Sequence, residues 1–241
     1  TSHFKDRNMK ALKKLFTQMT FSNRPCLDMN SFLRNFEGFD RSSNGSFEQQ
    51  DANEFLMLIF NKFATYPELY SLISGRLTEI FKGDDFTKQQ EIQFDILSLM
   101  VLGMNSLNDS MKAFSLPETI DDYQVSPETR MTIQKSTEIS CLPPYLFVHL
   151  KKFNYSIETG ERMKINEKYE FEMEYEFQTN EKYQLIGIVI HQGNPDAGHY
   201  YSYIKSNNSW YVMNDAIITP STETQMKNEA YGDAENTSAY L

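Results

Sequence analysis

A histidine and an Asn-Asp pair near the end of the chain have the types and spacing of an acid–base site. They lie in "AGHYYSYIKSNNSWYVMND", where His199 follows Gly198 and Asn214-Asp215 begins 15 residues later (214 − 199). Two short strands joined by a tight turn would place these outer ends side by side. Asn or Asp can then accept a hydrogen bond from one imidazole nitrogen and leave the other as a base. The spacing predicts two members of a nucleophile–histidine–orienter triad, and Gly198 would let another chain approach closely.

Two cysteines, Cys26 and Cys141, could supply the nucleophile of such a triad. Cys26 follows Pro25 and precedes a predicted helix, whose N-terminus would stabilise a thiolate. Cys141 precedes Leu142-Pro143-Pro144 at the predicted start of an apolar strand, which predicts a buried, inert thiol. Spacing alone does not choose between them.

The first part of the chain carries the apolar periodicity of helices. Helices are predicted in "MKALKKLFTQM", "MNSFLRNFEGF" and "FEQQDANEFLMLIFNKFATY", because apolar residues recur on one face of each. The Ser-, Asn- and Gly-rich segment "DRSSNGS" predicts a loop. We therefore expect residues 1–75 to be mainly helical.

Residues 76–241 are rich in β-branched and aromatic residues, which favour strands. Strands are predicted in "EIQFDILSLMV", "STEISCLPPYLFVHLKKFNY", "YEFEMEYEF", "KYQLIGIVIHQG", "GHYYSYIK", "SWYVMND" and "TSAYL", with short helices in "SLNDSMKAF" and "TETQMKNEAYG". Helices followed by antiparallel strands predict the α+β class and one domain over 1–241.

Composition and charge limit the classes of function. The chain has 33 acidic and 23 basic residues and a formal net charge of −10, which argues against nucleic acid as a partner. No apolar run approaches the ~20 residues that cross a bilayer, and the charged start does not read as a secretion signal. Two cysteines favour a reducing compartment, so we expect the chain in the cytoplasm or nucleus. We also expect a monomer that binds no membrane.

Four segments, in order, resemble motifs of the ubiquitin-specific proteases, cysteine-type deubiquitinases of the papain-like thumb–palm–fingers fold. The resemblance covers about 45–241 and is closest to the large substrate-specific members. It rests on "QQDANEFL" (49–56), "LPPYLFVHLKKFNY" (142–155), "YQLIGIVIHQGNPDAGHYYSYI" (183–204) and "WYVMND" (210–215).

The resemblance implies catalytic roles for three residues already singled out. His199 matches the general base, Asn214 matches the third triad member, and Asp215 beside it would share the orienting role. The implied reaction is hydrolysis of the bond after the terminal glycine of ubiquitin, with no cofactor.

The resemblance also implies a binding site for the C-terminal tail of ubiquitin. Asp51 and Glu54 match positions that hold the backbone and arginines of that tail, Phe153 matches an aromatic residue that packs on it, and Tyr200 matches one beside the terminal glycines. Asp51 and Glu54 could equally serve as negative charges at a helix N-terminus, and both interpretations can hold.

The chain departs from the family pattern in two places. The Gly-rich cysteine box, which opens a helix in the family, is absent and belongs upstream of "QQDANEFL". Cys26 does not lie in such a box, so the family comparison argues against Cys26 as the nucleophile. The chain as given is then expected to lack a nucleophile. The paired Cys-x-x-Cys motifs that hold zinc in the fingers are missing as well. "FKGDDFTKQQEIQF" and "DDYQVSPETRM" stand in their place, which predicts fingers without metal, held by packing or reduced in size.

Three interpretations follow. The first is an active deubiquitinase whose N-terminal segment is not included, with ubiquitin and ubiquitinated proteins as partners. The second is a ubiquitin-binding pseudoenzyme that lacks the cysteine. The third is an unrelated β-rich interaction domain. Retention of both His199 and Asn214 favours the first, because a dead site has no need for a base together with its orienter.

Overall fold

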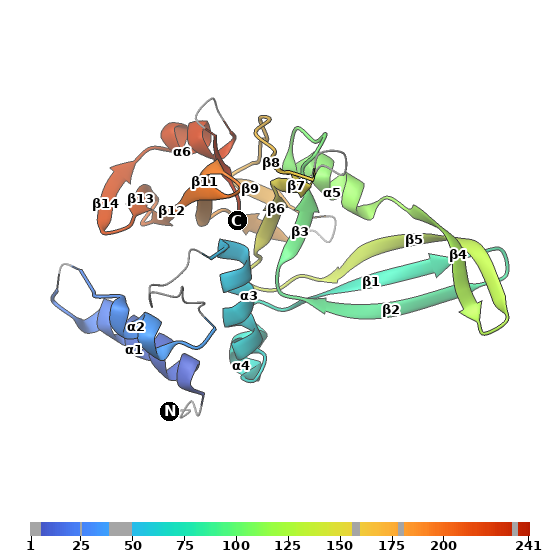
Figure 1. The fold of residues 1–241 in the computed structure, drawn as a ribbon, viewed down its shortest axis with the longest axis horizontal. Helices are drawn as coiled ribbons and strands as arrows, with labels where there is room; N and C mark the ends of the chain where they lie inside the picture. The colour runs from blue at the N-terminus through green and yellow to red at the C-terminus, as the bar shows by residue number, and fades with distance from the viewer. Residues whose placement is uncertain (1–5, 25, 39–49, 156–159, 178–180, 233–235) are drawn as a thin grey trace. The chain divides into compact units, whose positions relative to one another are not determined.

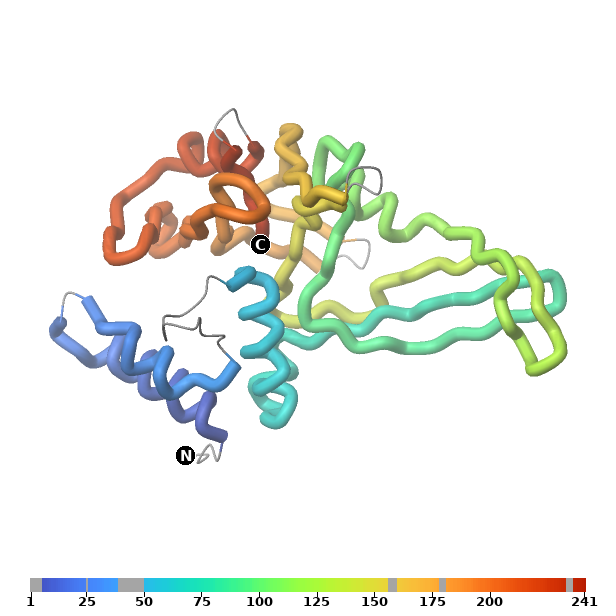
Figure 2. Tube along the Cα trace, in the orientation of Figure 1, coloured from blue at the N-terminus to red at the C-terminus, as the bar shows by residue number. Residues whose placement is uncertain are grey.

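The computed structural model describes residues 6–24, 26–38, 50–155, 160–177, 181–232 and 236–241. The chain divides into two compact units, residues 1–70 and 71–241. Figures 1 and 2 show the ribbon and the chain trace. Within the described ranges, no helix is both long and apolar enough to cross a membrane. The predicted loop "DRSSNGS" lies outside the described residues.

Residues 1–70 contain four helices within the described ranges. They are α1 (Arg7–Phe21), α2 (Asn30–Asn35), α3 (Ala52–Phe63) and α4 (Pro67–Tyr70).

α1 and α2 pack through a small apolar core and through two hydrogen bonds from one polar side chain. Ala11, Phe32 and Phe36 form the buried core. The buried Asn8 amide donates to Glu37 O and its oxygen accepts from Glu37 N, at 2.9 and 2.7 Å. Because the side chain satisfies both backbone groups, the end of α2 is fixed against α1.

Residues 71–241 hold two short helices and fifteen strands within the described ranges. The helices are α5 (Leu107–Ser115) and α6 (Glu223–Ala230). The strands are β1 (Gly75–Lys82), β2 (Thr87–Phe94), β3 (Leu97–Met100), β4 (Glu118–Ser126), β5 (Thr129–Cys141), β6 (Val148–Lys151), β7 (Phe153–Tyr155), β8 (Arg162–Lys164), β9 (Glu174–Glu176), β10 (Lys182–Gln184), β11 (Gly187–Asn194), β12 (Ala197–Ser206), β13 (Ser209–Asn214), β14 (Ile217–Ser221) and β15 (Thr237–Ala239).

A five-stranded antiparallel sheet, ordered β14-β13-β12-β11-β15, positions the residues of interest (Figure 1). β12 and β13 pair from Ser206↔Ser209, which leaves Asn207-Asn208 as a two-residue turn. Both asparagines have positive φ, 49° and 62°, as hairpin turns of this length require. This turn chemistry fixes the register of the hairpin.

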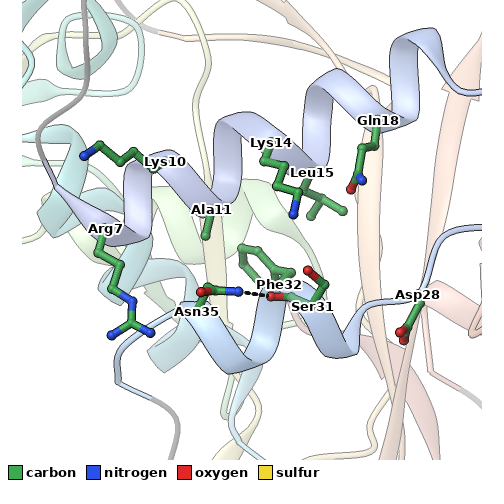
Figure 3. A pocket seen from close by; sticks show the side chains of 10 residues that line it. All are labelled: Arg7, Lys10, Ala11, Lys14, Leu15, Gln18, Asp28, Ser31, Phe32 and Asn35. Carbon is green, nitrogen blue, oxygen red and sulfur yellow. Dashed lines mark hydrogen bonds between the residues drawn. The ribbon is translucent and has the colours of Figure 1, made fainter.

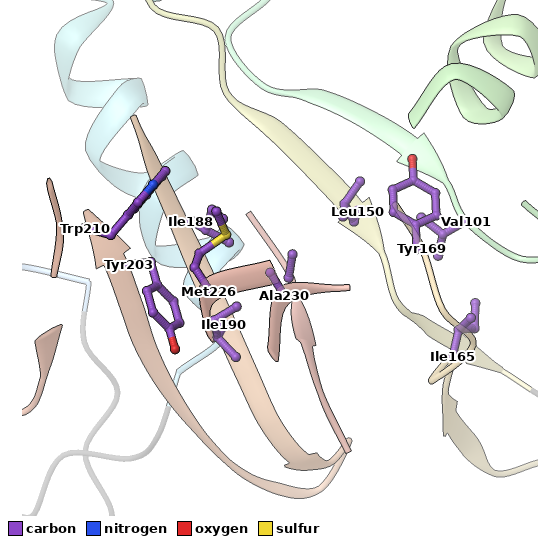
Figure 4. Packing of buried hydrophobic residues seen from close by; sticks show 11 residues of the cluster. Val101, Leu150, Ile165, Tyr169, Ile188, Ile190, Tyr203, Trp210, Met226 and Ala230 are labelled. Atoms are coloured by element: carbon purple, nitrogen blue, oxygen red, sulfur yellow. The ribbon is translucent and has the colours of Figure 1, made fainter. Parts of the chain in front are cut away.

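α6 covers one face of the five-stranded sheet. Thr222 and Gln225 form a capping box that starts this helix. Its Met226 and Ala230 are buried against sheet residues that include Ile188, Ile190 and Tyr203, as Figure 4 shows. The core therefore lies beneath the strands that carry the candidate site.

A four-stranded antiparallel sheet, ordered β2-β1-β5-β4, contains the segments that stand where zinc motifs would lie. Phe81 and Tyr123 stack at 5.6 Å between β1 and β4, and Phe86 contacts the same tyrosine ring at 6.1 Å. Lys135 on β5 pairs with Glu79 on β1 at 2.8 Å. Aromatic packing and an ion pair thus hold these strands together.

Several element boundaries differ from the predicted ones. "EIQFDILSLMV" forms two strands in different sheets, because the chain bends between Phe94 and Leu97. In "YEFEMEYEF" only Glu174–Glu176 is a strand, and its Tyr169 is buried instead of alternating with solvent. Strands β1, β4, β8 and β14 and the short helix α4 were not predicted at all. β3 and β6 pair in parallel, whereas only antiparallel pairing was expected.

The two cysteines also differ from expectation. Cys141 is the last residue of β5, not the start of an apolar strand, and it is half-buried, not buried. Cys26 is exposed, and α2 begins only at Asn30. Cys26 therefore does not lie at the N-terminus of a helix.

Candidate functional site

His199 and Asn214 meet at one end of the five-stranded sheet, as their spacing predicts. His199 Nε2 lies 2.7 Å from Asn214 Oδ1. The register pairs Ser202 with Met213, which makes His199 and Asn214 diagonal neighbours across the β12–β13 hairpin. With Nε2 carrying the proton that Asn214 accepts, Nδ1 has the lone pair of a base.

Asp215 lies beside the pair but farther from the imidazole. Its Oδ2 is 3.9 Å from His199 Nε2, and its side chain is 81% exposed. Its φ of 51° places it in the tight turn between β13 and β14. The carboxylate can attract an imidazolium, but water screens that attraction, so Asn214 is the closer orienting group.

Tyr201 supports the imidazole from its own strand. The two rings are nearly parallel, with centroids 6.3 Å apart. The Tyr201 hydroxyl donates to Glu229 Oε2 at 2.6 Å, which ties it to α6. No role was predicted for Tyr201, although strand alternation alone places it on the same face as His199.

Gly198 is required by the neighbouring strand. A Cβ on Gly198 would lie 2.2 Å from Nε2 of the buried His191 and 2.7 Å from Gln192 O. The close approach inferred from the sequence is therefore that of β11 within this chain. The absence of a side chain lets β11 and β12 pair beside the histidine.

Phe153 and Tyr200 lie in one aromatic cluster, on the other face of β12 from His199. His191 contacts Phe153 edge-to-face at 5.0 Å and Tyr200 at 4.9 Å. Tyr240 completes the cluster at 5.3 Å from Phe153 and 5.6 Å from Tyr200. His191 and Tyr240 were not predicted, because only the pairing of β11 with β15 brings them together.

Asp51 and Glu54 belong to the other unit, at the start of α3. Asp51 is the N-cap residue, and its carboxylate accepts from Asn53 N and Glu54 N at 2.8 and 3.1 Å. Glu54 is an acidic residue in the first turn. The helix-terminus interpretation of Asp51 is thus confirmed.

No cluster suited to a metal ion is found in the described ranges, where no three His, Cys, Asp or Glu side chains converge. A small hollow does lie between α1 and α2, with basic residues on α1 and polar ones on α2 (Figure 3). It is lined by Arg7, Lys10, Ala11, Lys14, Leu15, Gln18, Asp28, Ser31, Phe32 and Asn35. None of these residues belongs to the predicted site.

Curated proteins similar to the chain are ubiquitin carboxyl-terminal hydrolases. The chain is 27% identical over 253 residues to ubiquitin carboxyl-terminal hydrolase 5 of Schizosaccharomyces pombe, covering 95% of this chain and 22% of that protein. It is 26% identical over 267 residues to ubiquitin carboxyl-terminal hydrolase 7 of Caenorhabditis briggsae, covering 96% and 23%. The chain therefore spans less than a quarter of the length of these relatives.

Solved structures show the same fold. The SAGA Ubp8/Sgf11/Sus1/Sgf73 DUB module bound to ubiquitin aldehyde matches with a TM-score of 0.67 at 23% identity, covering 80% of this chain and 48% of the matched chain. This confirms the predicted α+β fold of the papain-like deubiquitinase type. A sequence model described as "ubiquitin carboxyl-terminal hydrolase" matches residues 2–241. With that match over nearly its whole length, the chain belongs to the ubiquitin carboxyl-terminal hydrolase family.

Proposed function

We propose that this chain carries the base and orienting residues of a deubiquitinase that hydrolyses the bond after the C-terminal glycine of ubiquitin. The observation that supports this most is the 2.7 Å contact between His199 Nε2 and Asn214 Oδ1. A neutral amide fixes the ring orientation and directs Nδ1 toward a nucleophile. The Tyr201 ring, which Glu229 holds through its hydroxyl, lies beside the imidazole, so we propose that the base is positioned before substrate arrives.

In the proposed reaction, His199 Nδ1 takes the proton of a cysteine thiol. The thiolate attacks the carbonyl carbon of the terminal glycine, and the imidazolium gives its proton to the leaving amine as the carbon–nitrogen bond breaks. Water, deprotonated by the same imidazole, then attacks the thioester and returns the thiol. Positioned acid–base help of this kind contributes about 10²–10⁴ in rate.

The nucleophile is proposed to be a cysteine encoded before Thr1. Two observations support this over the cysteines within the chain. Cys141 ends β5 in the four-stranded sheet, whereas His199 lies in the five-stranded sheet. Cys26 lies in a segment between α1 and α2, outside any helix.

The tail of ubiquitin is proposed to contact Phe153 and Tyr200, with Asp51 and Glu54 holding its backbone and arginines. The aromatic cluster supports this, because Phe153 and Tyr200 are fixed by shared contacts with His191 and Tyr240. Acidic side chains would attract a cationic tail. We further propose a monomer in the cytoplasm or nucleus, with ubiquitinated proteins as substrates and without cofactor, nucleic acid or membrane.

The test uses the full-length protein and ubiquitin that carries a C-terminal electrophile, with intact mass as the readout. A single ubiquitin adduct on an upstream cysteine is expected. An adduct on Cys26 would contradict the proposed nucleophile, and no adduct despite measurable ubiquitin binding would indicate a pseudoenzyme.

His199→Ala is expected to lower turnover of a fluorogenic ubiquitin substrate by about 10²–10⁴ while ubiquitin binding stays near the wild-type value. Asn214→Asp serves as the matched variant, because a carboxylate can still accept from Nε2 and should retain more activity than Asn214→Ala. Wild-type turnover by His199→Ala would rule out the assigned base.

A further inference from the structure

The strand after the Asn-Asp pair exposes an apolar side chain beside the candidate base. β14 pairs with β13 through Asn214↔Ile217, so Ile217 faces the same side of the sheet as Asn214. Cross-strand partners place their Cβ atoms about 5 Å apart. Ile217 is nevertheless 65% exposed, although it adjoins the His199–Asn214 pair.

The next residue provides an internal comparison. Ile218 is 62% exposed and pairs with Met213, which places it on the opposite face of the same edge strand. Ile217 and Ile218 thus have equal size, nearly equal exposure and the same strand environment. They differ in which face they occupy, and only Ile217 shares the face of His199.

The proposed chemistry determines which part of the substrate lies near Ile217. His199 must give a proton to the leaving amine, which is the end of an acceptor lysine side chain. Only the lysine side chain joins that amine to the acceptor backbone. The residues on either side of the lysine must therefore lie close to the surface around His199. On this face that surface includes the exposed Asp215 carboxylate and the exposed Ile217 side chain.

We propose that Ile217 is a specificity-determining residue that contacts the acceptor segment, favouring an apolar side chain next to the ubiquitinated lysine. Asp215, with its 81% exposed carboxylate, complements the positive charge that the leaving lysine acquires. This inference rests on the proposed deubiquitinase function. It concerns the leaving group, whereas Phe153 and Tyr200 concern the ubiquitin tail.

The test compares three substrates of the full-length protein. One is ubiquitin with a small fluorogenic leaving group, which has no acceptor segment. The other two are ubiquitin joined by an isopeptide bond to a lysine peptide with either leucine or serine on both sides of the lysine. The wild-type protein is expected to cleave the leucine peptide with about five- to tenfold higher kcat/KM than the serine peptide.

Ile217→Ser should abolish the preference for the leucine peptide and leave kcat/KM for the fluorogenic substrate unchanged, whereas Ile218→Ser should keep the preference. Equal effects of the two variants, equal loss on all three substrates, or no wild-type preference would each overturn the inference. Absence of wild-type turnover on the fluorogenic substrate would overturn the proposed function itself, which distinguishes the two failures.

Discussion

At the scale of single residues, the candidate site depends on the absence of a side chain at Gly198. The space a Cβ would need is occupied by the His191 ring and by the Gln192 carbonyl oxygen. The ring is buried and packs against Phe153 and Tyr200, so it has little freedom to move aside. The absence of a methyl group at Gly198 therefore lets the aromatic cluster pack directly against β12, next to His199, the proposed base.

Gly198→Ala is expected to lower the free energy of unfolding by about 1–3 kcal/mol, because the added methyl group overpacks the β11–β12 contact. It should also slow adduct formation with the ubiquitin electrophile, since His199 is the next residue. Thermal unfolding and adduct rate measure the two effects. Gly187→Ala is the matched control on β11, where a Cβ would meet the end of the Ile204 side chain at 3.1 Å and Tyr203 O at an ordinary contact distance of 3.7 Å. An equal loss in both variants would contradict this account.

Residue identity and spacing predicted the His199–Asn214 pair because the two are local partners in one hairpin. The Asn207-Asn208 turn sets the register of the hairpin, and strand alternation places both side chains on one face. His191 and Tyr240 could not be found this way. They meet Phe153 through the pairing of β11 with β15, a contact between segments far apart in the chain.

At the scale of elements, α3 shows how one side chain can have two roles. Asp51 caps the helix through two backbone amides. The family resemblance assigns the same residue to the ubiquitin tail. A substitution to alanine would remove both functions at once, so it cannot separate them.

Asp51→Asn separates the two roles, because asparagine is as good an N-cap as aspartate but has no charge. We expect Asp51→Ala to lower the free energy of unfolding by about 1 kcal/mol and Asp51→Asn to leave it nearly unchanged. Both should weaken ubiquitin binding, as measured by titration calorimetry. Wild-type affinity in Asp51→Asn would assign Asp51 to the cap alone.

Among the elements, the helices α1, α2 and α3 and the β11–β13 meander follow their sequence patterns. The four-stranded sheet does not, because neither β1 nor β4 alternates strictly between buried and exposed residues, and both strands gain their place by pairing with β5. Alternation is weak in such strands, and pairing with a distant partner decides the structure.

At the scale of the whole molecule, one buried charge opposes folding. Lys152 is 1% exposed, and its Nζ has no hydrogen-bond partner among the described residues. The ammonium lies 5.2 Å from the centre of the Tyr169 ring. Burial lowers the pKa of Lys152 to about 8, from an ordinary value of 10.5, with Glu167 opposing the shift.

This shift predicts how stability depends on pH. Below pH 8 both folded and unfolded chains hold the Lys152 proton, so the cost of burying the charge is fully present. Between about pH 8 and 10.5 the unfolded chain binds more protons, and stability from this group rises by up to about 3 kcal/mol. The direction is opposite to that of a lysine stabilised by an ion pair.

Lys152→Met is expected to raise the free energy of unfolding at pH 7 by about 1–3 kcal/mol. The loss of the cation–π contact with Tyr169 reduces this gain. The difference from the wild type should shrink toward pH 10, as followed by denaturant unfolding at several pH values. Lys151→Met, at the exposed neighbouring position, is the control and should show no such trend. A constant difference across this pH range would refute the cost assigned to the buried charge.

The two-residue Asn207-Asn208 turn also has a kinetic consequence. Hairpins close in about 1–10 μs, whereas pairing of segments distant in the chain pays a larger loop-closure entropy and is slower. His199 and Asn214 lie within one such hairpin, but β1 must find β5 across the whole of β2 to β4. During folding, the alignment of base and orienter is therefore not the slow event. The time a newly made chain needs to become competent is set by its long-range strand pairing.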